Sequence, residues 1–111
     1  MSLTTDPTDP RLNKPGPTGQ NEVYLVLSDE ERAKGFVRPV RDAYRHVGSD
    51  NFSGCGKITT MGRALAETYA RQPSFYGATY CTTCAMHRPV GAEGEFVWIE
   101  NNGSVGPRVG T

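Results

Sequence analysis

The stretch Cys81-Thr82-Thr83-Cys84 places two thiols with two residues between them, and it decides how the rest of the sequence is interpreted. This spacing is typical of a zinc knuckle, in which backbone amides turn around the metal and donate hydrogen bonds to the sulfurs. A disulfide-linked domain is a weaker explanation, because the chain has only three cysteines and an odd number leaves one unpaired. The motif therefore predicts a metal site.

Two more ligands are needed to close a tetrahedral zinc site. Cys55 is followed by Gly56, a pair that lets the backbone turn beneath a metal-bound thiolate. His46 lies eight residues before Cys55, and its use would give two knuckles with two ligands each. His87, three residues after Cys84, is the alternative fourth ligand. We expect Cys55, Cys81, Cys84 and His46 to bind a structural Zn²⁺, with His87 as the alternative to His46.

The composition indicates one small domain that needs such support. The chain has 111 residues, of which 36% are hydrophobic, and small domains often gain stability from a metal ion. Its 12 basic and 12 acidic residues cancel, so the whole molecule has no electrostatic attraction to nucleic acid or to an anionic membrane. No apolar run approaches the length of a membrane span, and the first residues lack the pattern of a secretory signal. We expect a soluble cytosolic protein with no membrane partner.

The first 21 residues differ from the rest of the chain. They contain Pro7, Pro10, Pro15 and Pro17, which disfavour helix and interrupt hydrogen-bond ladders. We expect residues 1–21 to form an extended Pro/Gly-rich N-terminal arm, with these four prolines as partner-binding residues. Residues 22–111 are then the zinc-stabilised domain.

Within that domain the sequence predicts an α+β fold, resembling a zinc ribbon with short strands and one main helix. The helix is expected over about 60–71, where Met61, Leu65 and Tyr69 recur at four-residue spacing and Arg63, Glu67 and Arg71 form an outer ion-paired row. Further expectations are a short strand over 23–27, a short helix capped by Ser28, a strand over 37–47, and a terminal hairpin that contains residues 95–100 and the turn at 101–103.

No catalytic constellation accompanies the cysteines. A zinc deaminase requires a His-x-Glu motif and a proline before the Cys-x-x-Cys pair, whereas Tyr80 precedes Cys81 and Gly48 stands where the acid of a His46-x-Glu motif would lie. Three thiolates also suit a closed structural site better than the activation of water. We therefore expect a protein that is not an enzyme.

A locally basic segment allows an alternative function. Arg38, Arg41 and Arg45, with Tyr44 between them, offer cations for phosphate and a ring for stacking on a base. A nucleic-acid-binding role is possible on this ground but is not favoured, because the net charge of the chain is zero.

The segment from His46 to Trp98 resembles a group of small, mostly uncharacterised tailed-bacteriophage proteins that have a Cys/His zinc site. The resemblance is carried by Cys55-Gly56, by the run from Leu65 to Arg71, by Phe75-Tyr76-Gly77, and by Tyr80-Cys81 with Cys84, His87 and Pro89-Val90. It implies phage origin, and hence a location in the host cytoplasm during infection, with the virion capsid as a further location.

We expect a phage structural or assembly protein, such as a capsid-associated cement, decoration or minor virion protein, whose arm binds other phage proteins. The alternative is a zinc-ribbon regulatory protein that binds nucleic acid or a host factor during infection.

Overall fold

The computed structural model describes residues 2–12, 14, 16–17, 19–49 and 53–111. These residues form a mixed α+β fold of eight short strands and two helices, which confirms the α+β prediction at this level. In chain order the elements are β1 (Ser2–Thr4), β2 (Val23–Leu25), α1 (Asp29–Ala33), β3 (Ala43–His46), β4 (Ile58–Thr60), α2 (Arg63–Arg71), β5 (Ala78–Cys81), β6 (Met86–Pro89), β7 (Phe96–Ile99) and β8 (Val105–Arg108).

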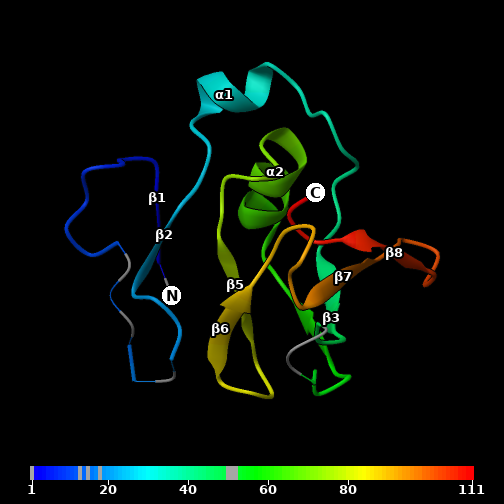
Figure 1. Cartoon of the computed structure of the whole chain (residues 1–111). Coiled ribbons are helices and arrows are strands. Elements are labelled where there is room, and N and C mark those ends of the chain that lie inside the picture. Colours follow the sequence, from blue (N-terminus) through cyan, green and yellow to red (C-terminus); the bar gives the residue numbers. More distant parts are fainter. Residues whose placement is uncertain (1, 13, 15, 18, 50–52) are drawn as a thin grey trace.

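The strands form three separate sheets (Figure 1). The largest is antiparallel with strand order β4-β3-β7-β8, the second is the β5-β6 hairpin, and the third is the parallel pair β1-β2. Strand β3 lies in the centre, where it pairs with both β4 and β7. Both ends of β3 are therefore held in register, including His46 at its last position.

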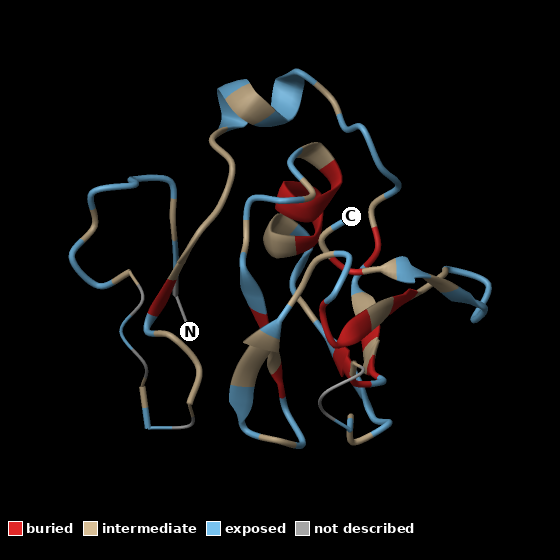
Figure 2. Cartoon of the chain, in the orientation of Figure 1, coloured by how far each residue is buried: buried red, intermediate tan, exposed pale blue. Residues whose placement is uncertain are grey.

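The core lies between the large sheet, α2 and the β5-β6 hairpin, where most of the buried residues gather (Figure 2). Tyr44 of β3 contacts Phe96 of β7 edge to face, with ring centroids 5.3 Å apart. Tyr69 of α2 contacts Trp98 of β7 in the same manner at 5.5 Å. Cys81 is part of this same buried cluster, so the predicted metal site lies against the core.

The short helix α1 begins where the sequence predicts, whereas α2 begins later than expected. Ser28 caps α1, because its Oγ accepts a hydrogen bond from the Glu31 backbone N–H at 3.3 Å. Gly35, with φ of +85°, follows the end of α1. The main helix α2 runs from Arg63 to Arg71 and not from residue 60, because residues 58–60 pair with β3 as strand β4.

The predicted row of ion pairs on α2 is confirmed between Arg63 and Glu67, but Glu67 does not lie on the outside of the helix. Its side chain is buried, and its Oε2 lies 3.1 Å from Arg32 of α1, while Arg63 lies 3.9 Å from its Oε1. Arg71 instead reaches Glu31 of α1. Glu67 and Arg71 therefore face α1 and join the two helices.

The strand predicted over 37–47 is shorter, running from Ala43 to His46. Val37 and Arg38 both donate their backbone N–H to the Ala70 carbonyl, at 2.9 Å each, and so belong to a loop that runs past α2. The terminal hairpin is confirmed as β7 and β8, with Gly103 at φ +88° in the turn between them.

The N-terminal segment folds back on itself, so the expected extended arm is not confirmed. Strand β1 pairs with β2, and Leu12 also forms a bridge with Val23, which is buried. The segment is joined to the body at Leu25, whose carbonyl accepts a hydrogen bond from the Tyr76 hydroxyl.

The four predicted partner-binding prolines lie in this segment. Pro7, Pro10 and Pro17 are exposed, and Pro15 lies outside the described residues.

In the part of the chain that the structure describes, neither helix has the length and apolarity to span a bilayer.

The core contacts lead to a stability prediction. Phe96 is fully buried, whereas Phe75 is 44% exposed. Phe96→Ala is expected to lower the free energy of unfolding by about 3–5 kcal/mol, because it removes a buried ring and leaves a cavity. Phe75→Ala, the matched control, should cost less than about 1 kcal/mol. Urea denaturation of the two purified variants checks this, and equal losses would contradict the position of the core.

Candidate metal centre

Four side chains from separate parts of the chain meet at one end of the large sheet. They are His46, Cys55, Cys81 and Cys84, and their potential ligand atoms all lie within 4.8 Å of one another. Cys81 and His46 are buried, and Cys55 and Cys84 are half-buried. These are the four residues that the sequence predicts as ligands, with His46 as the histidine.

Local backbone geometry brings Cys55 to His46. The backbone N–H of Gly56 donates to the His46 carbonyl at 2.8 Å, and the His46 N–H donates to the Lys57 carbonyl at 3.1 Å. Gly54 packs so tightly here that a Cβ would lie 2.2 Å from the His46 carbonyl oxygen. The loop can close on β3 only because residue 54 has no side chain.

The second pair of thiols has the expected knuckle geometry. The Ala85 N–H donates to the Cys81 carbonyl at 2.8 Å, and Ala85 has φ of +55°. The Cys84 N–H lies 3.4 Å from the Cys81 sulfur, an orientation that suits a hydrogen bond to a thiolate. Thr59 of β4 accepts the Thr82 N–H at 3.2 Å, which fixes the knuckle to the large sheet.

The separations between the donor atoms fit a tetrahedral metal ion. The sulfurs of Cys55 and Cys81 are 3.5 Å apart, and the Cys84 sulfur is 3.4 Å from Nδ1 of His46. Tetrahedral zinc, with Zn–S of about 2.3 Å, places its ligand atoms about 3.6–3.8 Å apart. The cluster is therefore close to the size that a single ion requires.

A buried carboxylate orients the histidine. Oε1 of Glu95 lies 2.8 Å from Nε2 of His46, and Glu95 is only 1% exposed. Because a carboxylate only accepts hydrogen bonds, Nε2 carries the proton and the lone pair of Nδ1 faces the thiols. Nδ1 is therefore the nitrogen that can bind a metal.

Arg88 completes this chain of contacts. Its Nη2 lies 2.7 Å from Oε2 of Glu95, and its Nε donates to both carboxylate oxygens at 3.0–3.1 Å. The Arg88 hydrogen bond lowers the pKa of Glu95, burial opposes that shift, and His46 adds to the lowering. Glu95 therefore stays ionised, as an acceptor for the His46 N–H must be.

The thiols lie too close together to ionise independently. For Cys55 burial acts to raise the pKa, but hydrogen bonds from the Lys57 backbone, His46 and the other thiols outweigh it and lower the pKa to about 7. For Cys84 burial, together with the neighbouring Cys81 and Cys55, raises the pKa to about 11. A bound cation would remove this conflict between like charges.

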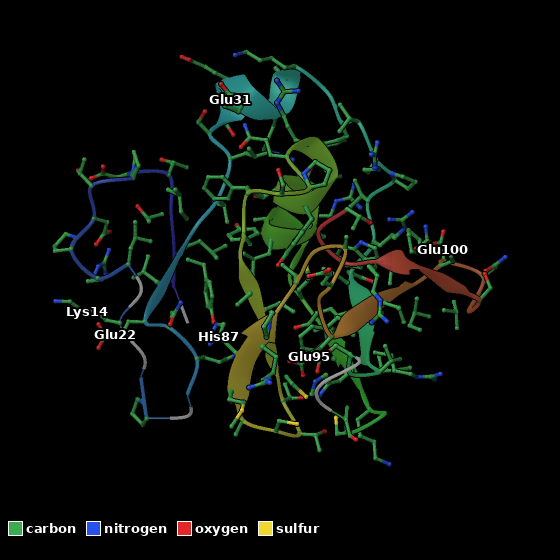
Figure 3. The ribbon with its side chains drawn as sticks, in the orientation of Figure 1. Lys14, Glu22, Glu31, His87, Glu95 and Glu100 are labelled. Carbon is green, nitrogen blue, oxygen red and sulfur yellow. The ribbon has the colours of Figure 1, made fainter. Side chains whose placement is uncertain are left out.

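His87, the alternative fourth ligand, lies elsewhere. Figure 3 shows it apart from Glu95, on the side of β6 that faces the N-terminal segment. Its Nε2 is 2.8 Å from the Tyr24 hydroxyl, and its ring packs against Tyr80 at 5.4 Å. Burial lowers the pKa of His87, and a Gly19 backbone hydrogen bond opposes this. Through Tyr24, His87 therefore joins β2, and the N-terminal segment paired with it, to β6.

The predicted nucleic-acid surface is not assembled. Arg41 is 8% exposed, lies over the Trp98 ring and pairs with Glu100 at 2.8 Å. Tyr44 is buried, and its hydroxyl donates to the Tyr80 carbonyl.

Arg38 and Arg45 remain, and they do not share a surface with a stacking ring. Arg38 lies in an exposed loop, and Arg45 lies on β3 facing away from Tyr44. The structure therefore does not bring the four residues together in one exposed row.

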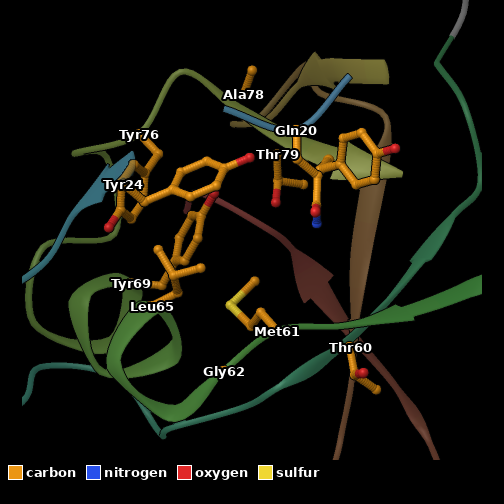
Figure 4. A pocket seen from close by; sticks show the side chains of 11 residues that line it. Gln20, Tyr24, Thr60, Met61, Gly62, Leu65, Tyr69, Tyr76, Ala78 and Thr79 are labelled. Carbon is orange, nitrogen blue, oxygen red and sulfur yellow. The ribbon is translucent and has the colours of Figure 1, made fainter. Parts of the chain in front are cut away.

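A small cavity lies beside α2 (Figure 4). It measures about 80 Å³ and is lined by aromatic and apolar groups that include Tyr24, Met61, Leu65, Tyr69 and Tyr76. Among the described residues that line it there is no carboxylate, histidine, cysteine, lysine or arginine. Burial raises the pKa of Tyr76 to about 12, so this hydroxyl is a poor acid or base near neutral pH.

Sequence reasoning did not identify Glu95 and Arg88. The only available signal was the general rule that a metal-binding histidine has a carboxylate or carbonyl behind it, and any of the twelve acidic residues could have been that carboxylate.

Neither a known protein family, nor a curated protein, nor a solved structure matches the chain.

The contact behind His46 predicts a change in metal affinity. Glu95→Gln keeps the size of the side chain but removes the charge that holds both His46 and Arg88. The affinity for Zn²⁺ is expected to fall about 10–100-fold, the usual effect of losing such a partner. Competition with a zinc-binding dye measures it, and Glu93→Gln at an exposed position two residues earlier is the control. Equal affinities for the two variants would contradict the role of Glu95.

Proposed function

We propose that the protein is a non-enzymatic, zinc-stabilised structural or assembly protein of a tailed bacteriophage. The observation that carries the metal part of this proposal is the convergence of three thiols and the Nδ1 atom of His46 within 4.8 Å. Soft thiolates with one imidazole, in tetrahedral arrangement, are the ligands of structural zinc. Bound there, the ion would connect β3, the loop at Cys55 and the β5-β6 turn.

A structural role is supported by the number of protein ligands. A catalytic zinc site has three protein ligands and keeps its fourth position for water or substrate, whereas four protein donors meet here. Glu95 is paired with Arg88 and His46 and is 1% exposed, so it is poorly placed to move protons to and from a substrate. These observations favour an ion that stabilises the fold.

A direct test compares the two histidines. One zinc ion per chain is expected after native purification. His46→Ala should lower zinc occupancy and reduce Tm by at least about 10 °C, because 1 kcal/mol corresponds to roughly 4–8 °C in a domain of this size. His87→Ala should keep one zinc ion per chain, since His87 contacts Tyr24 and not the thiols. Elemental analysis and calorimetry measure both effects, and metal loss in His87→Ala alone would contradict the assignment.

The assembly role rests on the sequence resemblance and on the N-terminal segment. Three prolines in this segment are exposed, namely Pro7, Pro10 and Pro17. Proline restricts the unbound chain, so a segment that contains it loses less entropy when it binds a partner. We propose that this segment binds neighbouring capsid or virion proteins. The location would then be the host cytoplasm during infection, followed by the virion.

Exchange of these prolines tests the proposal. Replacing Pro7, Pro10 and Pro17 by glycine adds about 0.4–1 kcal/mol of chain entropy at each site, so partner affinity should fall roughly 10–100-fold. The measurement is the copy number in purified virions by quantitative mass spectrometry. Pro39→Gly, exposed and outside the segment, is the control. Absence of the unmodified protein from intact particles would contradict the structural role.

A regulatory protein that binds a host factor is the alternative. This alternative uses the same zinc site and the same N-terminal segment. It predicts that the protein is present in infected cells but absent from purified virions.

A further inference from the structure

The large sheet has two faces, and only one of them covers the core. Tyr44, His46, Phe96 and Trp98 point to the core and the metal centre. We call the opposite side the outer face. Its side chains, placed by strand alternation and register, are Ala43, Arg45, Val47, Ile58, Thr60, Val97, Ile99, Val105 and Arg108.

The outer face is unusually apolar for a surface that meets water. An antiparallel sheet with one solvated face normally carries polar residues there, whereas most of the outer-face residues are aliphatic. Val47, Ile58 and Val105 are 43%, 46% and 63% exposed. Strand β7, Phe96-Val97-Trp98-Ile99, is apolar on both sides, as is typical of a strand that is covered on both faces. This pattern indicates a protein-binding surface.

Arg45 supplies the second observation. It lies in the middle of one row of the outer face, paired with Ile58 of β4 on one side and Val97 of β7 on the other. Its Nε is buried and has no hydrogen-bond acceptor among the described residues. A buried donor without an acceptor costs free energy. An acceptor from a binding partner could therefore form a hydrogen bond with Arg45 Nε.

The other two arginines near this sheet lie beside oxygen atoms of the chain. Arg41 Nε lacks a hydrogen bond of good geometry, as Arg45 Nε does, but it forms an ion pair with Oε1 of Glu100 at 2.8 Å, and Arg108 donates to the carbonyls of Gly48 and Gly94 at 2.9 and 3.1 Å. Arg45 is distinguished because it has neither an ion pair nor a hydrogen-bond acceptor for its buried Nε among the described residues.

The residues of the outer face determine what kind of partner fits. They include no carboxylate, so a second copy of the chain that packs through the same face would bring Arg45 against apolar groups and another cation. The nearest strand carboxylates are not available, because Glu95 is held by Arg88 and Glu100 by Arg41. A different protein can supply what is missing.

We propose that the outer face binds a partner protein whose surface presents apolar side chains around one carboxylate, and that this carboxylate accepts a hydrogen bond from Arg45. The inference rests on the proposed protein-binding role, but it uses a surface separate from the N-terminal segment. Apolar contact with Ile58, Val97 and Val105 would exclude water from the ion pair and strengthen it.

The test begins with a photo-crosslinking amino acid in place of Ile58 in the full chain, made during phage infection. The crosslinked partner and the site of attachment are identified by mass spectrometry. We expect one partner, with an apolar surface and an aspartate or glutamate near the attachment site. Binding between the two purified proteins is then measured with Arg45→Glu, which should weaken it at least about 30-fold, as expected for breaking a buried interfacial ion pair.

Charge exchange makes the test specific. Changing the partner's acid to arginine should restore binding to the Arg45→Glu chain. Arg38→Glu, the same change at an exposed arginine outside the face, should leave binding unchanged. Zinc content and Tm of each variant confirm that it is folded.

Three results would overturn the proposal: no crosslinked product, a crosslink to a second copy of this chain, or equal binding by Arg45→Glu and the unmodified chain. A host protein that meets the charge-exchange criterion would support the outer face as a binding surface, and it would contradict the virion role proposed above.

Discussion

The fold depends on one constraint, which is that four donor atoms from distant parts of the chain lie within 4.8 Å of one another. Three of them are thiols, and their mutual repulsion on ionisation opposes the arrangement unless a cation is present. The strand that ends at His46, the tight loop before Cys55 and the β5-β6 turn all converge at this point. With a metal ion bound at this point, a domain with a small aromatic core would gain stability that burial alone supplies only in part.

Arginines pair with glutamates at three places in the fold. Glu95 pairs with Arg88 behind His46, Glu100 pairs with Arg41 over Trp98, and Glu67 pairs with Arg32 between the two helices. Buried pairs of this kind add little net stability, because desolvation offsets much of the attraction. In this protein the pairs hold parts of the chain in position. Glu95 orients the ring of His46, Glu100 holds the loop before β3 through Arg41, and Glu67 holds α1 through Arg32.

The sequence was sufficient wherever the signal was local. Cys-x-x-Cys spacing predicted the knuckle, four-residue spacing predicted α2, and the Asn-Asn-Gly turn predicted the terminal hairpin. It failed where tertiary register decides the outcome. The burial of Glu67 and Glu95 depends on arginines 35 and 7 residues away, and Tyr44 belongs to the core because β3 is the central strand. The N-terminal segment pairs with β2 through β1 and Leu12, and β2 is held by the contact of Leu25 with Tyr76. No local pattern encodes these contacts.

X-ray absorption at the zinc edge of natively purified protein tests the central claim most directly, because it reports the atoms bound to the metal. The account predicts one zinc ion per chain with three sulfur neighbours at about 2.3 Å and one nitrogen at about 2.0–2.1 Å. A spectrum without stoichiometric zinc, or a shell made mainly of oxygen and nitrogen, would contradict it.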